Sequence, residues 1–200
     1  MRKKDPKKEE AIIKAAMQEF ARQGFHKTRM SQIADKAGVA AGSLYLYFKN
    51  KQGIIIHIIN STWERMYNEY EIISDRPDYS AVEKLDALID LVFDIFTGNP
   101  EQAIIFVNEQ HYFSQAGIVD FTIQEDRFIE LGKKVLREGI ADGIFNPYID
   151  ITIFKEFIFG GLRHLLNLWA SKPEAFKLNK IRQELKLIIK KGILKQHTSG

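Results

Sequence analysis

The sequence has no cysteine and no uninterrupted apolar run long enough to span a bilayer. Without cysteine the chain can form neither disulfides nor thiolate metal sites, and nothing in it argues for secretion. The N-terminal residues, Met-Arg-Lys-Lys-Asp-Pro, are basic but lack the apolar stretch of a signal peptide. We therefore expect a cytoplasmic protein that does not act at a membrane.

Sequence motifs of common enzymes are also missing. The chain has no glycine-rich phosphate-binding loop, no cluster of metal ligands and no nucleophile motif. A single histidine beside an acidic residue, His111 beside Glu109, is weak evidence for acid–base catalysis. We expect neither an enzyme nor a cofactor or metal site. The remote alternative is an enzyme whose active site has no recognisable motif.

Charge is distributed unevenly along the chain. Residues 1–53 hold twelve Lys and Arg against five Asp and Glu, a net of +7, whereas residues 54–200 hold seventeen against twenty-one, a net of −4. Together they account for the net charge of +3. A basic first part on an acidic remainder fits phosphate binding by the first part alone. The alternative is an ordinary solvated tail, because five of the basic residues are Arg2, Lys3, Lys4, Lys7 and Lys8.

Apolar residues recur at helical spacing along the chain, with no alternating strand pattern and no internal repeat. Glycine, proline and asparagine interrupt this pattern, for example at Gly24 and at Gly98-Asn99-Pro100. The length is ample for a buried core. We predict an all-α fold of about nine helices, covering roughly residues 6–23, 30–37, 41–48, 54–74, 80–97, 101–113, 119–142, 151–171 and 178–194.

Residues 30–48 have the pattern of a helix-turn-helix, whose short second helix lies in the DNA major groove. Ile33 and Ala34 share one face of the first helix, and Gly38 stands where a helix end or a positive φ is needed. Leu44, with Tyr47 or Phe48, forms the inward face of the second helix. Most short helical pairs separated by glycine are only packing units, so spacing alone leaves both interpretations open.

Residues 38–51, Gly-Val-Ala-Ala-Gly-Ser-Leu-Tyr-Leu-Tyr-Phe-Lys-Asn-Lys, resemble the signature of TetR-family transcriptional regulators. Residues 15–25 are similar to that family's first helix and its Gly-aromatic end. Ala40 and Ser43 depart from the signature, where Ser and Thr are frequent, and Ala40 lacks a hydroxyl that could cap the helix or bind a phosphate. The resemblance implies a DNA-binding domain over residues 1–53 and an effector-binding and dimerisation domain over residues 54–200.

Candidate DNA contacts lie in and beside the second helix. Side chains that point away from Leu44 can reach base edges, and Tyr45 offers both a hydroxyl and an apolar surface for a thymine methyl group. Thr28 is expected to cap the first helix of the pair, near the DNA backbone. Tyr47 either reaches a phosphate, as in similar family members, or packs half-buried. The candidates are Thr28, Arg29, Ser31, Ala41, Gly42, Ser43, Tyr45, Leu46, Tyr47 and Lys51.

The corner Lys49-Asn50-Lys51 precedes a long helix, and Asn50 is well suited to cap it. Lys51 then falls in the first helical turn, where the helix dipole disfavours a cation. A phosphate bound there would remove the conflict, because backbone amides and ammonium would share one anion. The alternative is a solvated lysine, and the family resemblance favours the phosphate contact.

The second part of the chain is rich in phenylalanine, with eleven of the fourteen after residue 53. Such residues usually form core, but the family's bodies commonly hold a small-molecule pocket between helices. Arg163, which follows two glycines on an apolar helix, pairs either with an anionic effector or with a neighbouring carboxylate. Asp86, Asp90 and Asp94, four residues apart, are expected to form a solvated stripe. Candidate ligand contacts are Phe93, Phe96, Phe106, His111, Phe128 and Arg163.

The last two predicted helices have wide apolar faces, and Gly160-Gly161 permits close backbone approach. The resemblance implies a four-helix interface between two copies, whose two-fold symmetry would match a palindromic operator. The alternative is that both faces are covered within one protomer. Candidate interface residues are Leu162, Leu165, Leu166, Trp169, Leu185, Ile188 and Ile189.

Within the family, the phrases Tyr-Leu-Tyr-Phe-Lys-Asn-Lys and Leu-Arg-Glu-Gly-Ile-Ala-Asp-Gly look most like regulators of fatty-acid degradation that release DNA on binding long-chain acyl-CoA. The expected function is therefore a homodimeric repressor of transcription that binds double-stranded DNA and is released by a small hydrophobic effector. Alternatives are a multidrug or other hydrophobic effector, or an architectural DNA-binding protein without one.

Overall fold

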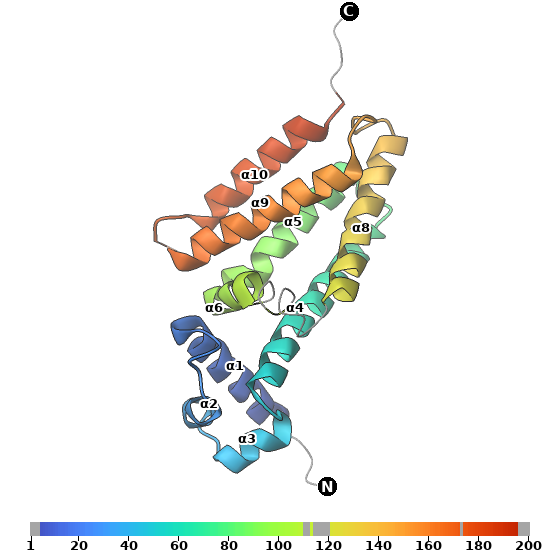
Figure 1. The fold of residues 1–200 in the computed structure, drawn as a ribbon. Coiled ribbons are helices and arrows are strands. Elements are labelled where there is room, and N and C mark those ends of the chain that lie inside the picture. The colour runs from blue at the N-terminus through green and yellow to red at the C-terminus, as the bar shows by residue number, and fades with distance from the viewer. Residues whose placement is uncertain (1–4, 110–112, 114–120, 173, 196–200) are drawn as a thin grey trace, which may run out of the picture. The chain divides into compact units, whose positions relative to one another are not determined.

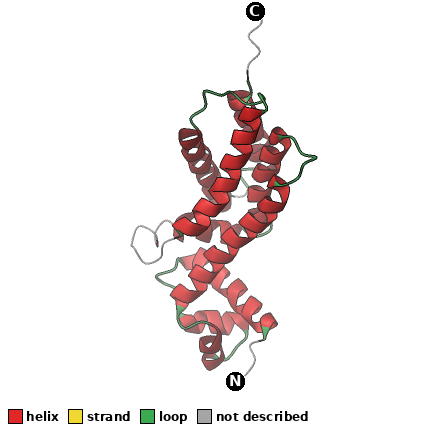
Figure 2. Cartoon of the chain, turned by 90° about the vertical axis from the view of Figure 1, so that its right-hand side faces the viewer, coloured by secondary structure: helices red, strands yellow, loops and turns green. Residues whose placement is uncertain are grey.

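The computed structural model describes residues 5–109, 113, 121–172 and 174–195, and the regular elements within them are all helices (Figures 1 and 2). The expected all-α fold is confirmed. None of the described helices combines the length and apolar character needed to cross a bilayer. The elements are α1 (Pro6–Gln23), α2 (Met30–Ala37), α3 (Ala41–Tyr47), α4 (Lys51–Ser74), α5 (Ala81–Thr97), α6 (Pro100–Ile104), the π-helical segment η1 (Ile105–Glu109), α8 (Thr122–Ala141), α9 (Ile151–Ser171) and α10 (Leu178–Ile193).

The chain divides into two compact units. Unit 1 comprises Met1–Thr62 and Asn99–Phe121, and unit 2 comprises Trp63–Gly98 and Thr122–Gly200. Helix α4 contributes residues to both units, and α6 and η1 belong to unit 1, although they come late in the sequence. The division of function at residues 53 and 54 stays a prediction, because compactness alone does not assign a function to either part.

Local signals define the first helices of unit 1. Pro6 occupies the first turn of α1, and the Asp5 side chain accepts a hydrogen bond from the Lys7 amide at 3.0 Å. Gly24 ends α1 with φ 80°, and Gly38 ends α2 in the left-handed region with φ 65°, a conformation that costs glycine little. The Asn50 side chain caps α4 by accepting from the Gly53 amide at 2.8 Å. The start of α1 at Pro6, the ends at Gly24 and Gly38 and the Asn50 cap agree with the sequence prediction, whereas the Asp5 cap was not predicted.

The core of unit 1 joins the helix-turn-helix to the later α6–η1 segment. Ile12, Ala16 and Phe20 of α1 are buried, and α1 packs against both α2 and α6. The Gln102 side-chain amide donates to Thr62 Oγ1 at 2.8 Å. One continuous helix was expected over residues 101–113, but α6 ends at Ile104 and passes into η1, where the hydrogen bonds span five residues.

Unit 2 is built on α5. Ser80 and Glu83 form a capping box at its start, because each side chain accepts a hydrogen bond from the other's backbone amide. Its apolar face, including Leu85, Ile89 and Phe93, is buried, and α5 packs against α8 and α10. Apolar spacing along α5 therefore predicted its buried side correctly.

The acidic stripe of α5 is ion-paired as well as solvent-exposed, with the side chains of Asp86, Asp90 and Asp94 25%, 38% and 61% exposed. Lys190 Nζ lies 2.5 Å from an Asp86 carboxylate oxygen, and Lys186 Nζ lies 2.5 Å from an Asp90 carboxylate oxygen. Arg182 contacts both Asp90 and Asp94. The sequence interpretation missed the ion pairs. The spacing of four residues on α5 is matched by equal spacing on α10, so the two stripes form an ion-pair ladder.

The connection between α8 and α9 is folded tightly onto the end of α10. The Asn146 amide donates to the Ile193 carbonyl at 2.8 Å, and the Lys195 amide donates to the Ile144 carbonyl at 3.0 Å. Gly143 has φ 69°, and the fully buried Phe145 ring lies where a side chain at Gly139 would stand. The sequence Gly-Ile-Ala-Asp-Gly-Ile-Phe thus packs the end of α8 and the α8–α9 connection against the C-terminal end of α10.

Candidate nucleic-acid interface

Helix α3 separates a buried face from an exposed one. Leu44 is fully buried and Phe48, just beyond the helix, is 7% exposed, whereas Tyr45 and Leu46 are 55% and 57% exposed. Ala41 and Gly42 are exposed as well, and Ser43 is half-buried. Large apolar and aromatic side chains kept in solvent are unusual enough to indicate a contact surface. This face is the one that the sequence predicted to reach base edges.

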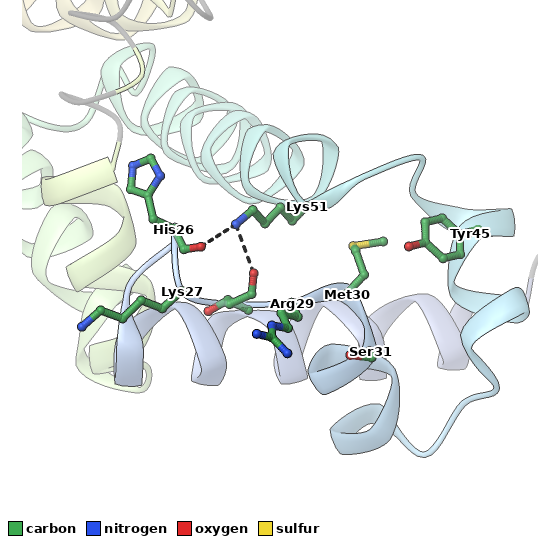
Figure 3. A pocket seen from close by; sticks show the side chains of 8 residues that line it. His26, Lys27, Arg29, Met30, Ser31, Tyr45 and Lys51 are labelled. Carbon is green, nitrogen blue, oxygen red and sulfur yellow. Dashed lines mark hydrogen bonds between the residues drawn. The ribbon is translucent and has the colours of Figure 1, made fainter.

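Beside this face lies an open recess of about 740 Å³ (Figure 3). Lys27 and Arg29 supply exposed positive charge, and the recess includes Met30 and Ser31 at the start of α2. Positive side chains next to a helix N-terminus attract phosphate. The recess is lined by His26, Lys27, Thr28, Arg29, Met30, Ser31, Tyr45 and Lys51.

Sequence reasoning missed His26, Lys27 and Met30 as members of this recess. The available signal was their adjacency to Thr28 and Arg29, which had been singled out. Their position depends on the turn after Gly24, which brings the α1–α2 connection beside the start of α4, and that turn is not encoded by helical spacing.

Thr28 does not cap α2, so the expected cap is wrong. Arg29 is the residue before α2, and its amide donates to Gln32 Oε1 at 2.8 Å. The Thr28 side chain is 1% exposed, and its hydroxyl donates to the Gly24 carbonyl at 2.9 Å and the Glu19 carbonyl at 3.2 Å. The hydroxyl satisfies carbonyl groups at the end of α1 instead of facing the DNA backbone.

Lys51 is engaged within unit 1, and a phosphate contact by Lys51 stays a prediction. Its ammonium donates to the carbonyl oxygens of Phe25 at 2.8 Å, His26 at 2.9 Å and Thr28 at 3.1 Å, and it lies 4.5 Å from the centre of the Phe25 ring. These backbone carbonyls compensate its charge at the start of α4 (Figure 3).

Tyr47 is half-buried, and its hydroxyl oxygen accepts a hydrogen bond from the Asp5 amide at 2.9 Å. This bond ties the end of α3 to the residue that caps α1. It supports the packing interpretation, and a phosphate contact by Tyr47 stays a prediction.

A buried carboxylate connects α1 to α2. Glu19 Oε2 accepts hydrogen bonds from Arg22 Nη2 at 2.6 Å and from the side-chain amide of Gln23 at 3.0 Å. Glu19 Oε1 accepts a hydrogen bond from Lys36 Nζ at 3.1 Å. Gln23 also donates to Gln32 Oε1 at 3.2 Å. Hydrogen bonding by Arg22, followed by Lys36, holds the pKa of Glu19 below its ordinary value despite burial. The network fixes α2 against α1.

The predicted ligand contacts do not form one described site. Phe93, Phe96 and Phe128 are almost fully buried in unit 2, whereas Phe106 belongs to unit 1. His111 lies outside the described residues. Burial raises the pKa of Glu125, and the Arg163 guanidinium partly offsets that rise, which supports the alternative that Arg163 neighbours a carboxylate.

Phe128 does belong to an aromatic cluster in unit 2. Its ring centre lies 5.8 Å from that of Trp63, 5.9 Å from that of Tyr70 and 6.2 Å from that of Phe159. Tyr70 is fully buried, yet its hydroxyl has no hydrogen-bond partner among the described residues. Sequence reasoning missed Tyr70, because a tyrosine at helical spacing is ordinarily core.

Most predicted dimer contacts are covered within the protomer, and that part of the expectation needs correction. Apolar spacing identifies a hydrophobic face but not what covers it. Leu165 is half-buried, and Ile188 is 57% exposed. Ile153 and Phe157 on α9, which were not predicted, are 68% and 69% exposed. The covered residues are Leu162, Leu166, Trp169, Leu185 and Ile189.

Comparison with known proteins agrees with the helix-turn-helix. Residues 12–58 match the family described as bacterial regulatory proteins, tetR family, and residues 78–169 match the tetracyclin repressor-like C-terminal domain. The fatty acid metabolism regulator protein of Bacillus subtilis is 28% identical over 96% of this chain and 98% of its own length. The HTH-type transcriptional repressor KstR2 of Mycolicibacterium smegmatis is 31% identical over 74% of this chain and 72% of its own length.

Solved structures give the same result. The fatty acid degradation regulator FadR of Bacillus halodurans is 26% identical, with a TM-score of 0.79 over 94% of this chain and 96% of that one. FadR of Bacillus subtilis in complex with stearoyl-CoA is 26% identical, with a TM-score of 0.78 over 92% of this chain and 99% of that one. These relatives are regulators and not enzymes. The chain belongs to the TetR family of bacterial regulatory proteins and is a DNA-binding regulator of transcription.

Proposed function

We propose that this regulator is a cytoplasmic repressor that binds a palindromic operator as a homodimer and is released by long-chain acyl-CoA. The observation that supports it most is the exposed Tyr45–Leu46 face beside the basic recess of unit 1. Arg29 and Ser31 are proposed to contact phosphates, and Tyr45 and Leu46 to contact bases. Because this face has few bidentate base readers, DNA shape is expected to add to specificity.

The proposed dimer forms through α9 and α10. Ile153, Phe157 and Ile188 are exposed, and a side chain at Gly160 or Gly161 would meet no atom within 4 Å. Each mid-helix glycine costs about 0.5–1 kcal/mol relative to alanine, and no neighbour in the described part of the chain requires either one. A groove of about 400 Å³, with Leu165 among its lining residues, continues this face onto α10. A second copy would cover the exposed side chains and use the glycines for close approach.

The proposed effector site is the aromatic cluster of unit 2. Burial, with the charge of Glu138, raises the pKa of the Tyr70 hydroxyl, so that it remains a hydrogen-bond donor at neutral pH. A buried donor without a partner calls for an explanation, since such groups are rare and unfavourable. The carbonyl of an acyl thioester can accept this hydrogen bond, and the phenylalanine and tryptophan rings suit its apolar chain. Stearoyl-CoA bound to a relative supports this ligand class.

Release follows from linkage between the two ligands. An effector that binds better when the two DNA-binding units are wrongly spaced shifts the population away from the DNA-competent state. DNA must then weaken effector binding by the same factor, with a coupling of roughly 1–3 kcal/mol.

The decisive experiment measures binding of labelled DNA from the gene's own upstream region, in physiological salt with excess competitor DNA. We expect tight specific binding that stearoyl-CoA abolishes and that free coenzyme A leaves unchanged. Specific binding that no acyl-CoA affects would keep the regulator and reject this effector, favouring another hydrophobic ligand. An absence of specific binding at this and other candidate sites would reject the repressor.

Two variants assign residues in the same assay. Tyr45→Ala should weaken specific binding by about 1–3 kcal/mol and relax sequence preference, whereas equal losses on all DNA would remove Tyr45 from base contact.

Tyr70→Phe deletes one hydroxyl and should raise the stearoyl-CoA concentration needed for release while leaving DNA affinity unchanged. An unaltered stearoyl-CoA response in Tyr70→Phe would place the acyl thioester elsewhere.

A further inference from the structure

Lys51 is fully occupied within unit 1. An ammonium carries three N–H donors, and the Lys51 ammonium meets three carbonyl oxygens at 2.8, 2.9 and 3.1 Å. The Phe25 ring adds a cation–π contact with its centre at 4.5 Å. No donor of this ammonium remains for a phosphate in this arrangement, although Lys51 lines the basic recess.

The three carbonyls belong to one segment, the connection between α1 and α2. This connection has no regular secondary structure, and few backbone hydrogen bonds hold it, such as that from the Thr28 amide to the Phe25 carbonyl at 3.3 Å. It carries Lys27 and Arg29 and leads directly into Ser31. The side chains that face the recess therefore depend on a segment whose carbonyl groups converge on Lys51 (Figure 3).

We propose that Lys51 is a positioning residue for DNA binding rather than a phosphate ligand. Its ammonium holds the α1–α2 connection against the start of α4, and this contact places Lys27, Arg29 and the first turn of α2 where they meet the DNA backbone. The inference rests on DNA binding by unit 1 and concerns how the binding surface is kept in shape.

Replacing Lys51 by arginine distinguishes the positioning role of Lys51 from direct phosphate binding. A guanidinium binds phosphate at least as well as an ammonium, because it donates two parallel hydrogen bonds. Its planar, spread donors cannot direct three hydrogen bonds to three carbonyls that converge on one nitrogen. Lys51→Arg should therefore preserve affinity if Lys51 binds phosphate and lose affinity if it positions the connection.

The test compares Lys51→Arg and Lys51→Met with the exposed Lys49→Met as the matched control for loss of one charge at the same corner. We expect both Lys51 variants to bind operator DNA roughly tenfold or more weakly, since several charge-assisted hydrogen bonds are lost, and Lys49→Met to change binding less. In the DNA-free protein, amide hydrogen exchange over residues 24–31 should accelerate in both Lys51 variants and stay unchanged in Lys49→Met.

A double-mutant cycle gives an independent readout. If Lys51 positions Arg29, then Arg29→Ala should cost much less in the Lys51→Met background than in the wild type, whereas two independent phosphate ligands would show additive losses. The proposal would be overturned if Lys51→Arg had the DNA affinity and the amide exchange of the wild type, and if the losses of affinity in the double-mutant cycle were additive. Amide exchange is measured without DNA. It therefore still tests whether Lys51 holds the α1–α2 connection, even if the wild-type protein binds no operator.

Discussion

At the scale of single residues, charge in the helix-turn-helix serves two purposes. Glu19 and Lys51 are both satisfied by neighbours within unit 1, whereas Lys27 and Arg29 face solvent in the recess. The distinction matters because a charge already compensated inside the protein gains little from a DNA phosphate. Basic composition alone therefore does not tell which of these side chains are already engaged within unit 1.

Glu19 should make stability depend on pH. Its pKa is lowered in the folded state, so its contribution is fully present above the ordinary carboxyl pKa and is lost as pH falls through the folded value. Glu19→Gln should lower the free energy of unfolding at pH 7 by roughly 1–3 kcal/mol, because charge-assisted hydrogen bonds are weakened. Denaturant unfolding at pH 7 and in steps below pH 4 checks this. The difference between variant and wild type should shrink in acid, and an undiminished difference would contradict the assignment.

At the scale of elements, ion pairs between α5 and α10 determine how these two helices of unit 2 align. The basic residues of α10 pair with the aspartates of α5, so the two helices are held in one antiparallel register. Exposed pairs are individually weak, but successive pairs along both helices disfavour a shifted alignment. Close packing at the α8–α9 connection completes the same unit.

Gly139, near the end of α8, should be irreplaceable because the connection packs against it. A Cβ atom there would stand 2.2 Å from Phe145 Cδ2, and the Phe145 ring is buried and unable to move away freely. Gly139→Ala should destabilise the protein by roughly 1–3 kcal/mol or more through overpacking. Thermal unfolding provides the measurement. Gly132→Ala, in the same helix, is the control and should be neutral or stabilising, because its Cβ atom would stand 3.7 Å from Leu88 Cδ2. Equal effects of the two substitutions would reject the packing argument.

At the scale of the whole molecule, the proposed function requires that two copies present their DNA-binding units together. The protomer leaves apolar side chains exposed on α9 and α10, while Leu162, Leu166 and Trp169 are already covered. A charge at Trp169 would disturb the protomer's own core, so exposed positions give the cleaner test of association.

Phe157→Glu and Ile188→Glu should each yield monomers, because each places a charge on a surface proposed to be buried between copies. Sedimentation analysis measures the mass, and circular dichroism checks that the fold is kept. Ile72→Glu, at a 71% exposed position on α4, should leave the dimer intact. Dimers that persist in both α9–α10 variants would place the interface elsewhere.

The sequence by itself determined most of the helices and several of their ends. Pro6, Asn50 and Ser80 start helices, Gly24 and Gly38 end them, and helical spacing correctly separated Leu44 from Tyr45. These features are local, since capping, positive φ and a period of 3.6 residues depend on neighbours in the chain. The family signature lies in the same local stretch, which explains why DNA binding was predictable.

Only the tertiary structure decided what each face touches. Spacing placed Asp86, Asp90 and Asp94 on one side of a helix, but their partners lie far along the chain on α10. Lys51 and Thr28 likewise meet carbonyl groups that a turn brings near them, and Leu162 is covered inside the protomer. A sequence pattern specifies which residues share a surface, whereas contacts between distant segments depend on how the whole chain packs, and periodicity carries no information about that.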